Sequence, residues 1–138
     1  MTISTFAVVM ALQAVASQAV PFSAVAGGPI SRIDEARKVV VRTDAEWQAL
    51  WKMHSSAPAP KVDFSTSLVV GVFLGMRPTA GYIVAIQRVS RTPAGALVEY
   101  VQTEPDRNRM IAQMLTFPFH LVSLPSDIKT VEFKQVAK

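Results

Sequence analysis

Few side chains in this protein could perform acid–base or nucleophilic chemistry. Its 138 residues include two histidines, His54 and His120, and no cysteine. The absence of cysteine excludes thiol nucleophiles, disulfides and thiolate metal sites. No serine stands in a Gly-x-Ser-x-Gly turn, and neither histidine belongs to a His-Glu-x-x-His pair. We therefore predict no catalytic residue, no metal ligand and no cofactor, and expect that the protein is not an enzyme.

The settings of the two histidines favour structural roles. His120 follows the apolar residues 117–119 and is more typical of a packed or hydrogen-bonded strand residue than of a ligand. His54 falls at the end of a predicted helix, where its charge or its N–H would suit the free carbonyl groups.

The loop from Arg77 to Tyr82, between two apolar runs, is the best candidate for recognition. Pro78 fixes its own φ and extends Arg77, while Gly81 permits a positive φ. A stiff loop loses little entropy on docking, and an arginine held in it can grip a carboxylate with two hydrogen bonds. The residues that we predict to contact a partner are Arg77, Pro78, Thr79, Gly81 and Tyr82. The alternative is that Gly75 and Gly81 only form a bend between strands.

Charge and composition indicate which kinds of molecule the protein could bind. The net charge is +4, but the basic residues are spread along the chain, with no basic run and no basic strand interleaved with aromatics. This pattern argues against nucleic acid and favours an ordinary solvated surface. The hydrophobic fraction of 50% is that of a globular domain.

The N-terminal residues resemble an export signal. No charged side chain precedes Arg32, and residues 6–15 form an apolar run too short to span a bilayer. Small-x-small cleavage patterns end at Ala19 and, with the better fit, at Ala26. We predict an export signal over residues 1–26, a linker over 27–35 and one domain over 36–138. The protein would then be periplasmic or extracellular, with no membrane span after signal removal.

The remaining pattern predicts a β-rich α+β fold, an antiparallel sheet or sandwich of about six strands with one helix packed on it. Thr43 and Glu46 have capping-box spacing, and Trp47, Leu50, Trp51 and His54 share one helical face. The two indoles are expected to fill the core, with a ligand platform as the alternative. Residues 67–75 are apolar on both faces, as in a central strand. Alternation from residue 82 places Val84 and Ile86 on one face and Val89 on the other.

Several motifs in order resemble the PrcB C-terminal domain family. They are Val62-Asp63-Phe64, the loop from Gly75 to Tyr82, and Pro118-Phe119-His120, within a similarity that runs from Val39 to Val136. The family is named for a subunit of a bacterial surface protease complex. The resemblance implies a secreted domain that associates with or stabilises a protease or another envelope protein, with no assigned activity in most members.

A shorter similarity supports an alternative function. The loop from Arg77 to Tyr82 is similar to the Asn-Pro-Thr-Thr-Gly-aromatic loop of chagasin-type protease inhibitors, with arginine in place of asparagine. It implies direct protease inhibition through Met76–Tyr82. A spacer role without a dedicated partner is the third interpretation.

Overall fold

Strand β3 (Ser67–Phe73) lies at the centre of three layers and is buried over most of its length. The computed structural model describes residues 18–138. One β3 face, with Leu68, Val70 and Val72, packs on a second sheet. The other face, with Val69 and Phe73, packs under the helix. Both faces are covered, as its continuous apolar sequence predicts.

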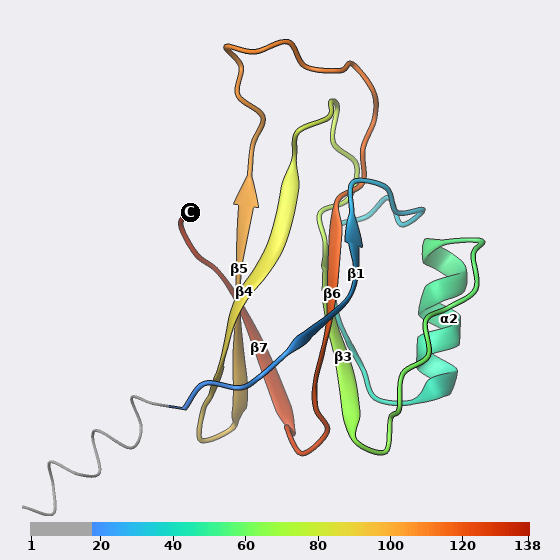
Figure 1. Cartoon of the computed structure of the whole chain (residues 1–138), viewed down its shortest axis with the longest axis vertical. Helices are drawn as coiled ribbons and strands as arrows, with labels where there is room; N and C mark the ends of the chain where they lie inside the picture. The colour runs from blue at the N-terminus through green and yellow to red at the C-terminus, as the bar shows by residue number, and fades with distance from the viewer. Residues whose placement is uncertain (1–17) are drawn as a thin grey trace, which may run out of the picture.

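The strands form two sheets that pack face to face, with the helix outside the larger one (Figure 1). The four-stranded sheet has the order β1-β6-β3-β2, and the three-stranded sheet has the order β4-β5-β7. All pairs are antiparallel except β5 with β7, which is parallel. The bounds of the other strands are β1 Ser23–Gly28, β2 Arg37–Val41, β4 Ile83–Arg91, β5 Gly95–Thr103, β6 Phe119–Pro125 and β7 Thr130–Gln135. The β-rich α+β prediction is confirmed.

The helix α2 (Asp44–His54) starts and packs as its sequence predicts. The Thr43 hydroxyl accepts from the Glu46 amide, and the Glu46 carboxylate accepts from the Thr43 amide, which completes the capping box. Trp47 and Trp51 are buried, and their indole N–H groups donate to backbone carbonyls at 2.9 and 2.8 Å. The two rings fill the core, so they are not a ligand platform.

We expected the side chain of His54 to cap the end of the helix, but it does not. Its Nδ1 lies 2.7 Å from the hydroxyl oxygen of Ser31, and its ring packs edge-on against Phe119 at 4.3 Å between centroids. The Ser31 oxygen also accepts from the Ile33 amide at 3.0 Å. The imidazole therefore ties the segment before β2 to the helix.

His120 is a hydrogen-bonded strand residue, as predicted, and it joins the two sheets. Strand β4 lies at the edge of its sheet, and beyond a bridge between Ser90 and Ala19 no strand among residues 18–138 runs along its outer side. The Ile86 amide donates to Nδ1 of His120 on β6 at 2.9 Å. Beside this bond, a β-bulge between Ile86 and Arg88 shifts the register, so that Val89 joins Ile86 in the core between the sheets. The prediction that these two residues face opposite ways is wrong for this reason.

Strand β1 was not expected as a strand, because it lies across the predicted export signal and linker. It pairs with β6 from Ser23 to Gly28. Val20, ahead of it, is 3% exposed, and its amide donates to the Val89 carbonyl at 2.8 Å. Within the predicted linker, Ser31 and Ile33 are buried, so these two residues pack on the domain, whereas most of the others from 27 to 35 are exposed.

Cleavage of the predicted export signal after Ala26 stays a prediction, and the structure shows which contacts it would remove. Cleavage there would remove Val20 from the core and cut β1 after its fourth residue. Between residues 18 and 138, the one helix is too short and too polar to cross a bilayer.

Truncation tests how far the N-terminal segment supports the fold. A chain that begins at Gln18 serves as the reference. A chain that begins at Gly27 should lose about 2 kcal/mol or more, because burial of one valine alone contributes about that much. Urea denaturation followed by tryptophan fluorescence measures the difference. Equal unfolding free energies would contradict the role assigned to β1 and Val20.

Acid should destabilise the domain through the two histidines. Burial lowers the pKa of His54 and of His120 below the ordinary histidine value. The histidines of the unfolded chain therefore bind protons more readily than those of the folded protein. The neutral imidazoles contribute fully to the free energy of unfolding above about pH 6.5, and this contribution is lost as the pH falls through the lower pKa values of the folded state. We expect lower urea midpoints at pH 5.5 than at pH 8. The drop should be smaller in His120→Gln, and equal midpoints in the parent protein would contradict the prediction.

Candidate functional site

The connection between β3 and β4, which we call the Arg77 loop (residues 74–82), needs glycine at two places. Gly75 has φ 77° and Gly81 has φ 95°, both in the left-handed region. A Cβ on Gly81 would come within 2.6 Å of the Pro105 side chain, and a Cβ on Gly75 within 2.7 Å of the Ala36 amide nitrogen. The loop therefore combines special backbone angles with close contacts to two other segments.

A second connection, the long loop (residues 104–118) between β5 and β6, fastens the Arg77 loop in place. Arg77 and Thr116 exchange two backbone hydrogen bonds, of 2.7 and 2.9 Å. The buried Thr116 hydroxyl donates to the Thr79 carbonyl at 2.8 Å, and the Ala80 amide donates to the Ala112 carbonyl at 3.1 Å. The two loops form one unit at one end of the sandwich, where the long loop arches over the top in Figure 1.

The five residues predicted to contact a partner do not form one uniform edge. Pro78 and Gly81 are exposed, whereas Arg77, Thr79 and Tyr82 are half-buried. The Thr79 hydroxyl donates to the Ala80 carbonyl at 2.9 Å, so it stiffens the loop. The Arg77 guanidinium lies 5.8 Å from the centre of the Tyr82 ring and turns back toward the body of the domain. A partner-binding role for these residues stays a prediction.

The loop end carries a feature that the sequence analysis missed, a concentration of exposed apolar side chains. Of the seven large hydrophobic residues that are exposed between residues 18 and 138, six lie on the Arg77 loop, the long loop, the neighbouring segment before β2 or the first position of β4. They are Ile30, Met76, Ile83, Met110, Met114 and Leu115. Hydrogen bonds join this neighbouring segment to both loops, from the Phe117 amide to the Pro29 carbonyl and from the Met76 amide to the Asp34 carbonyl.

This concentration has a weak signal in the sequence. Methionine and leucine recur in residues 110–115 without helical or strand periodicity, and apolar residues in an aperiodic loop have no core to enter. Met110 is fully exposed. Only the tertiary structure shows that these residues share one end of the sandwich with Met76 and Ile30.

A groove runs between the two loops. Its volume is about 280 Å³, and Gly81, Pro105, Met110 and Ala112 are among the residues that line it. An exposed ion pair between Arg109 and Asp106, at 3.6 Å, stands at its side. Apolar walls with charged residues around them are typical of protein-docking surfaces.

The histidines lie away from this groove. Ser31 and His54 form a hydrogen-bonded pair that the sequence analysis also missed, but both are more than nine-tenths buried. The Nδ1 atom of His120 accepts a hydrogen bond from the Ile86 amide. Within the described residues 18–138, no three carboxylate or imidazole side chains lie together as a metal site.

Fold and site together define a β-sandwich domain whose loop end presents apolar side chains. Residues 68–125, from β3 through β6 and including both loops, match the family described as PrcB C-terminal. The match covers less than half of the chain; it confirms the resemblance over these residues and indicates a protease-complex-associated domain. No curated protein and no solved structure matches the chain.

Substitution of Gly81 tests the geometry of the Arg77 loop. Gly81→Val should destabilise the fold by about 1–2 kcal/mol, because a branched side chain opposes the positive φ and meets Pro105. Gly28→Ala is the matched control, since its new Cβ has only an ordinary contact of 3.8 Å with Phe119. Thermal denaturation compares the two variants. An unchanged midpoint for Gly81→Val would show that the loop does not need glycine there.

Proposed function

We propose that this protein is an exported, non-catalytic binding domain that associates with a secreted protease or another envelope protein through its loop end. The observation that carries the proposal is the gathering of exposed apolar side chains on two loops that backbone hydrogen bonds hold together. Single exposed hydrophobic residues are ordinary, whereas six at one end of a small domain mark an interaction surface.

The construction of this end supports binding in a second way. Paired backbone hydrogen bonds and two glycines with positive φ hold the Arg77 loop before any partner arrives. A preorganised surface loses less conformational entropy on association. The methionines suit such a surface, because their flexible, polarisable side chains adapt to the shape of a partner.

Export and the absence of catalysis belong to the same proposal. The apolar N-terminal residues and the lack of cysteine suit an envelope protein. The family match supports a protein partner that is part of a protease complex. His54 is buried and His120 is half-buried and hydrogen-bonded to the Ile86 amide, both away from the groove, which supports a binding role over hydrolysis.

Direct protease inhibition through Met76–Tyr82 is the alternative, and the loop geometry favours it less. An inhibitor loop must enter a cleft, but the Arg77 loop rests on the long loop through the contacts of Thr79 and Gly81. Met76 and Pro78 remain exposed, so a contact with the rim of a protease is compatible with the structure.

Affinity capture from the envelope fraction of the source organism tests the proposal. The immobilised parent protein should enrich a specific protein, a protease or a subunit of its complex, which mass spectrometry identifies. Loss of two buried hydrophobic contacts costs several kcal/mol at an interface. The Met110→Asp, Met114→Asp double variant should therefore bind the recovered partner at least about thirtyfold more weakly by surface plasmon resonance.

Met53→Asp is the matched control, because Met53 is as exposed as Met114 but lies on α2. This control should bind like the parent. Recovery of no protein, or equal binding by the double variant, would contradict the proposed surface. Inhibition of a recovered protease at stoichiometric concentration would favour the alternative function.

A further inference from the structure

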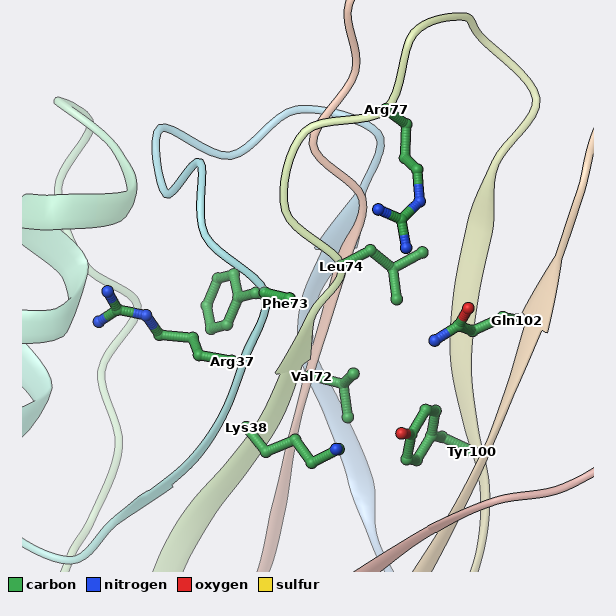
Figure 2. Close-up of a pocket in the computed structure, with 9 residues that line it drawn as sticks. Arg37, Lys38, Val72, Phe73, Leu74, Arg77, Tyr100 and Gln102 are labelled. Atoms are coloured by element: carbon green, nitrogen blue, oxygen red, sulfur yellow. The ribbon is translucent and has the colours of Figure 1, made fainter.

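A second hollow lies below the Arg77 loop, where the two sheets diverge (Figure 2). Strands β2 and β3 form one wall, and β5 forms the other. Its volume is about 130 Å³, smaller than the pockets that hold drug-sized ligands. The hollow therefore suits a small chemical group and not a whole cofactor.

Hydrogen-bond donors from three elements point into this hollow. Figure 2 shows the Arg77 guanidinium descending from the loop, the Lys38 amine approaching from β2 and the Gln102 amide facing it from β5. Arg37 also lines the hollow, but its side chain turns the other way and pairs with Glu35 at 3.6 Å. The lining contains no acidic residue.

The two inward cations lack a partner of opposite charge. Among residues 18–138, the ion pairs involve Arg37, Arg91 and Arg109, but neither Arg77 nor Lys38. Arg77 donates to the Met76 carbonyl at 3.3 Å and faces the Tyr82 ring, and Lys38 lies 5.7 Å from the centre of the Tyr100 ring. Several guanidinium donors and the whole ammonium group thus stay available.

We propose that this hollow is a binding site for a carboxylate on a short aliphatic stem. Arg77 offers a planar fork that matches the two carboxylate oxygens, Lys38 supplies a second positive charge, and the Gln102 amide adds a third donor. The side chains of Val72 and Leu74 give the remaining wall an apolar surface. That surface favours a stem of methylene groups over a compact inorganic anion, whose whole surface is polar.

Two sources can supply this chemistry, a free dicarboxylic acid or an acidic residue of a polypeptide. In the second case the hollow would anchor a partner beside the loop end. The proposal does not depend on the proposed function, because the hollow should bind a small carboxylate in the absence of any partner. Failure of partner capture and failure of carboxylate binding are separate results.

Titration of the ¹⁵N-labelled full chain with sodium glutarate tests the site by NMR, with sodium chloride at equal ionic strength as the reference. The side-chain signals of Arg77 and Gln102 should shift with glutarate and not with chloride. A second titration uses a short peptide with a central glutamate and blocked termini. Tighter binding of the peptide assigns the site to polypeptides, and tighter binding of glutarate assigns it to free acids.

Variants distinguish a specific carboxylate site from the general attraction of anions to a basic surface. Arg77→Ala and Lys38→Gln should each weaken binding about tenfold, the usual effect of losing one charged hydrogen-bond partner. Arg77→Lys should restore only part of the affinity, because an ammonium cannot make the paired contact. Arg88→Ala, at an exposed position outside the hollow, should bind like the parent.

Three results would overturn the proposal. They are no shift with either carboxylate, equal shifts with chloride, and equal weakening by Arg88→Ala and Arg77→Ala. Tighter binding of sodium phosphate than of glutarate would also overturn the carboxylate assignment. A thermal melt of each variant confirms folding, and Lys38→Gln on the exposed edge strand keeps the test available if Arg77→Ala is unstable.

Discussion

The double burial of β3 governs the rest of this structure. A strand with apolar side chains on both faces is stable in water only when a layer covers each face. The helix, anchored by its two tryptophans, covers one face, and the sheet of β4, β5 and β7 covers the other. Loops connect each layer to the central sheet, and these loops form the two ends of the domain.

Two hydrogen-bonded imidazoles, the buried His54 and the half-buried His120, connect elements of different layers. His54 joins the helix to the segment before β2 through Ser31, and His120 accepts a hydrogen bond from the Ile86 amide of the edge strand β4. An unsatisfied buried donor costs about 1–3 kcal/mol, so each bond favours one particular alignment of the layers. The histidines, the first candidates for chemistry in a chain without cysteine, thus contribute to structure.

The loop end follows from the same architecture. Strands β3 and β4 belong to different sheets, so the Arg77 loop must cross between the layers, and the long loop from β5 to β6 crosses beside it. Their mutual hydrogen bonds satisfy backbone groups that no strand can pair, and several of their apolar side chains are exposed. The hollow below them arises where the sheets diverge, and Arg77 contributes to both features.

Elements with local signals could be predicted from the amino-acid sequence. The capping box of Thr43 and Glu46, the buried face of α2, the two-sided burial of β3 and the special backbone of Gly81 depend on neighbouring residues, so they could be predicted. The family was also recognisable, because its motifs are contiguous. The tertiary structure decided what depends on distant partners. Strand β1 exists because β6 offers it an edge, and Val89 turns inward because of a bulge. Arg77, Lys38 and Gln102 line the same hollow only because the two sheets diverge at that point, and no short stretch of sequence indicates such an arrangement.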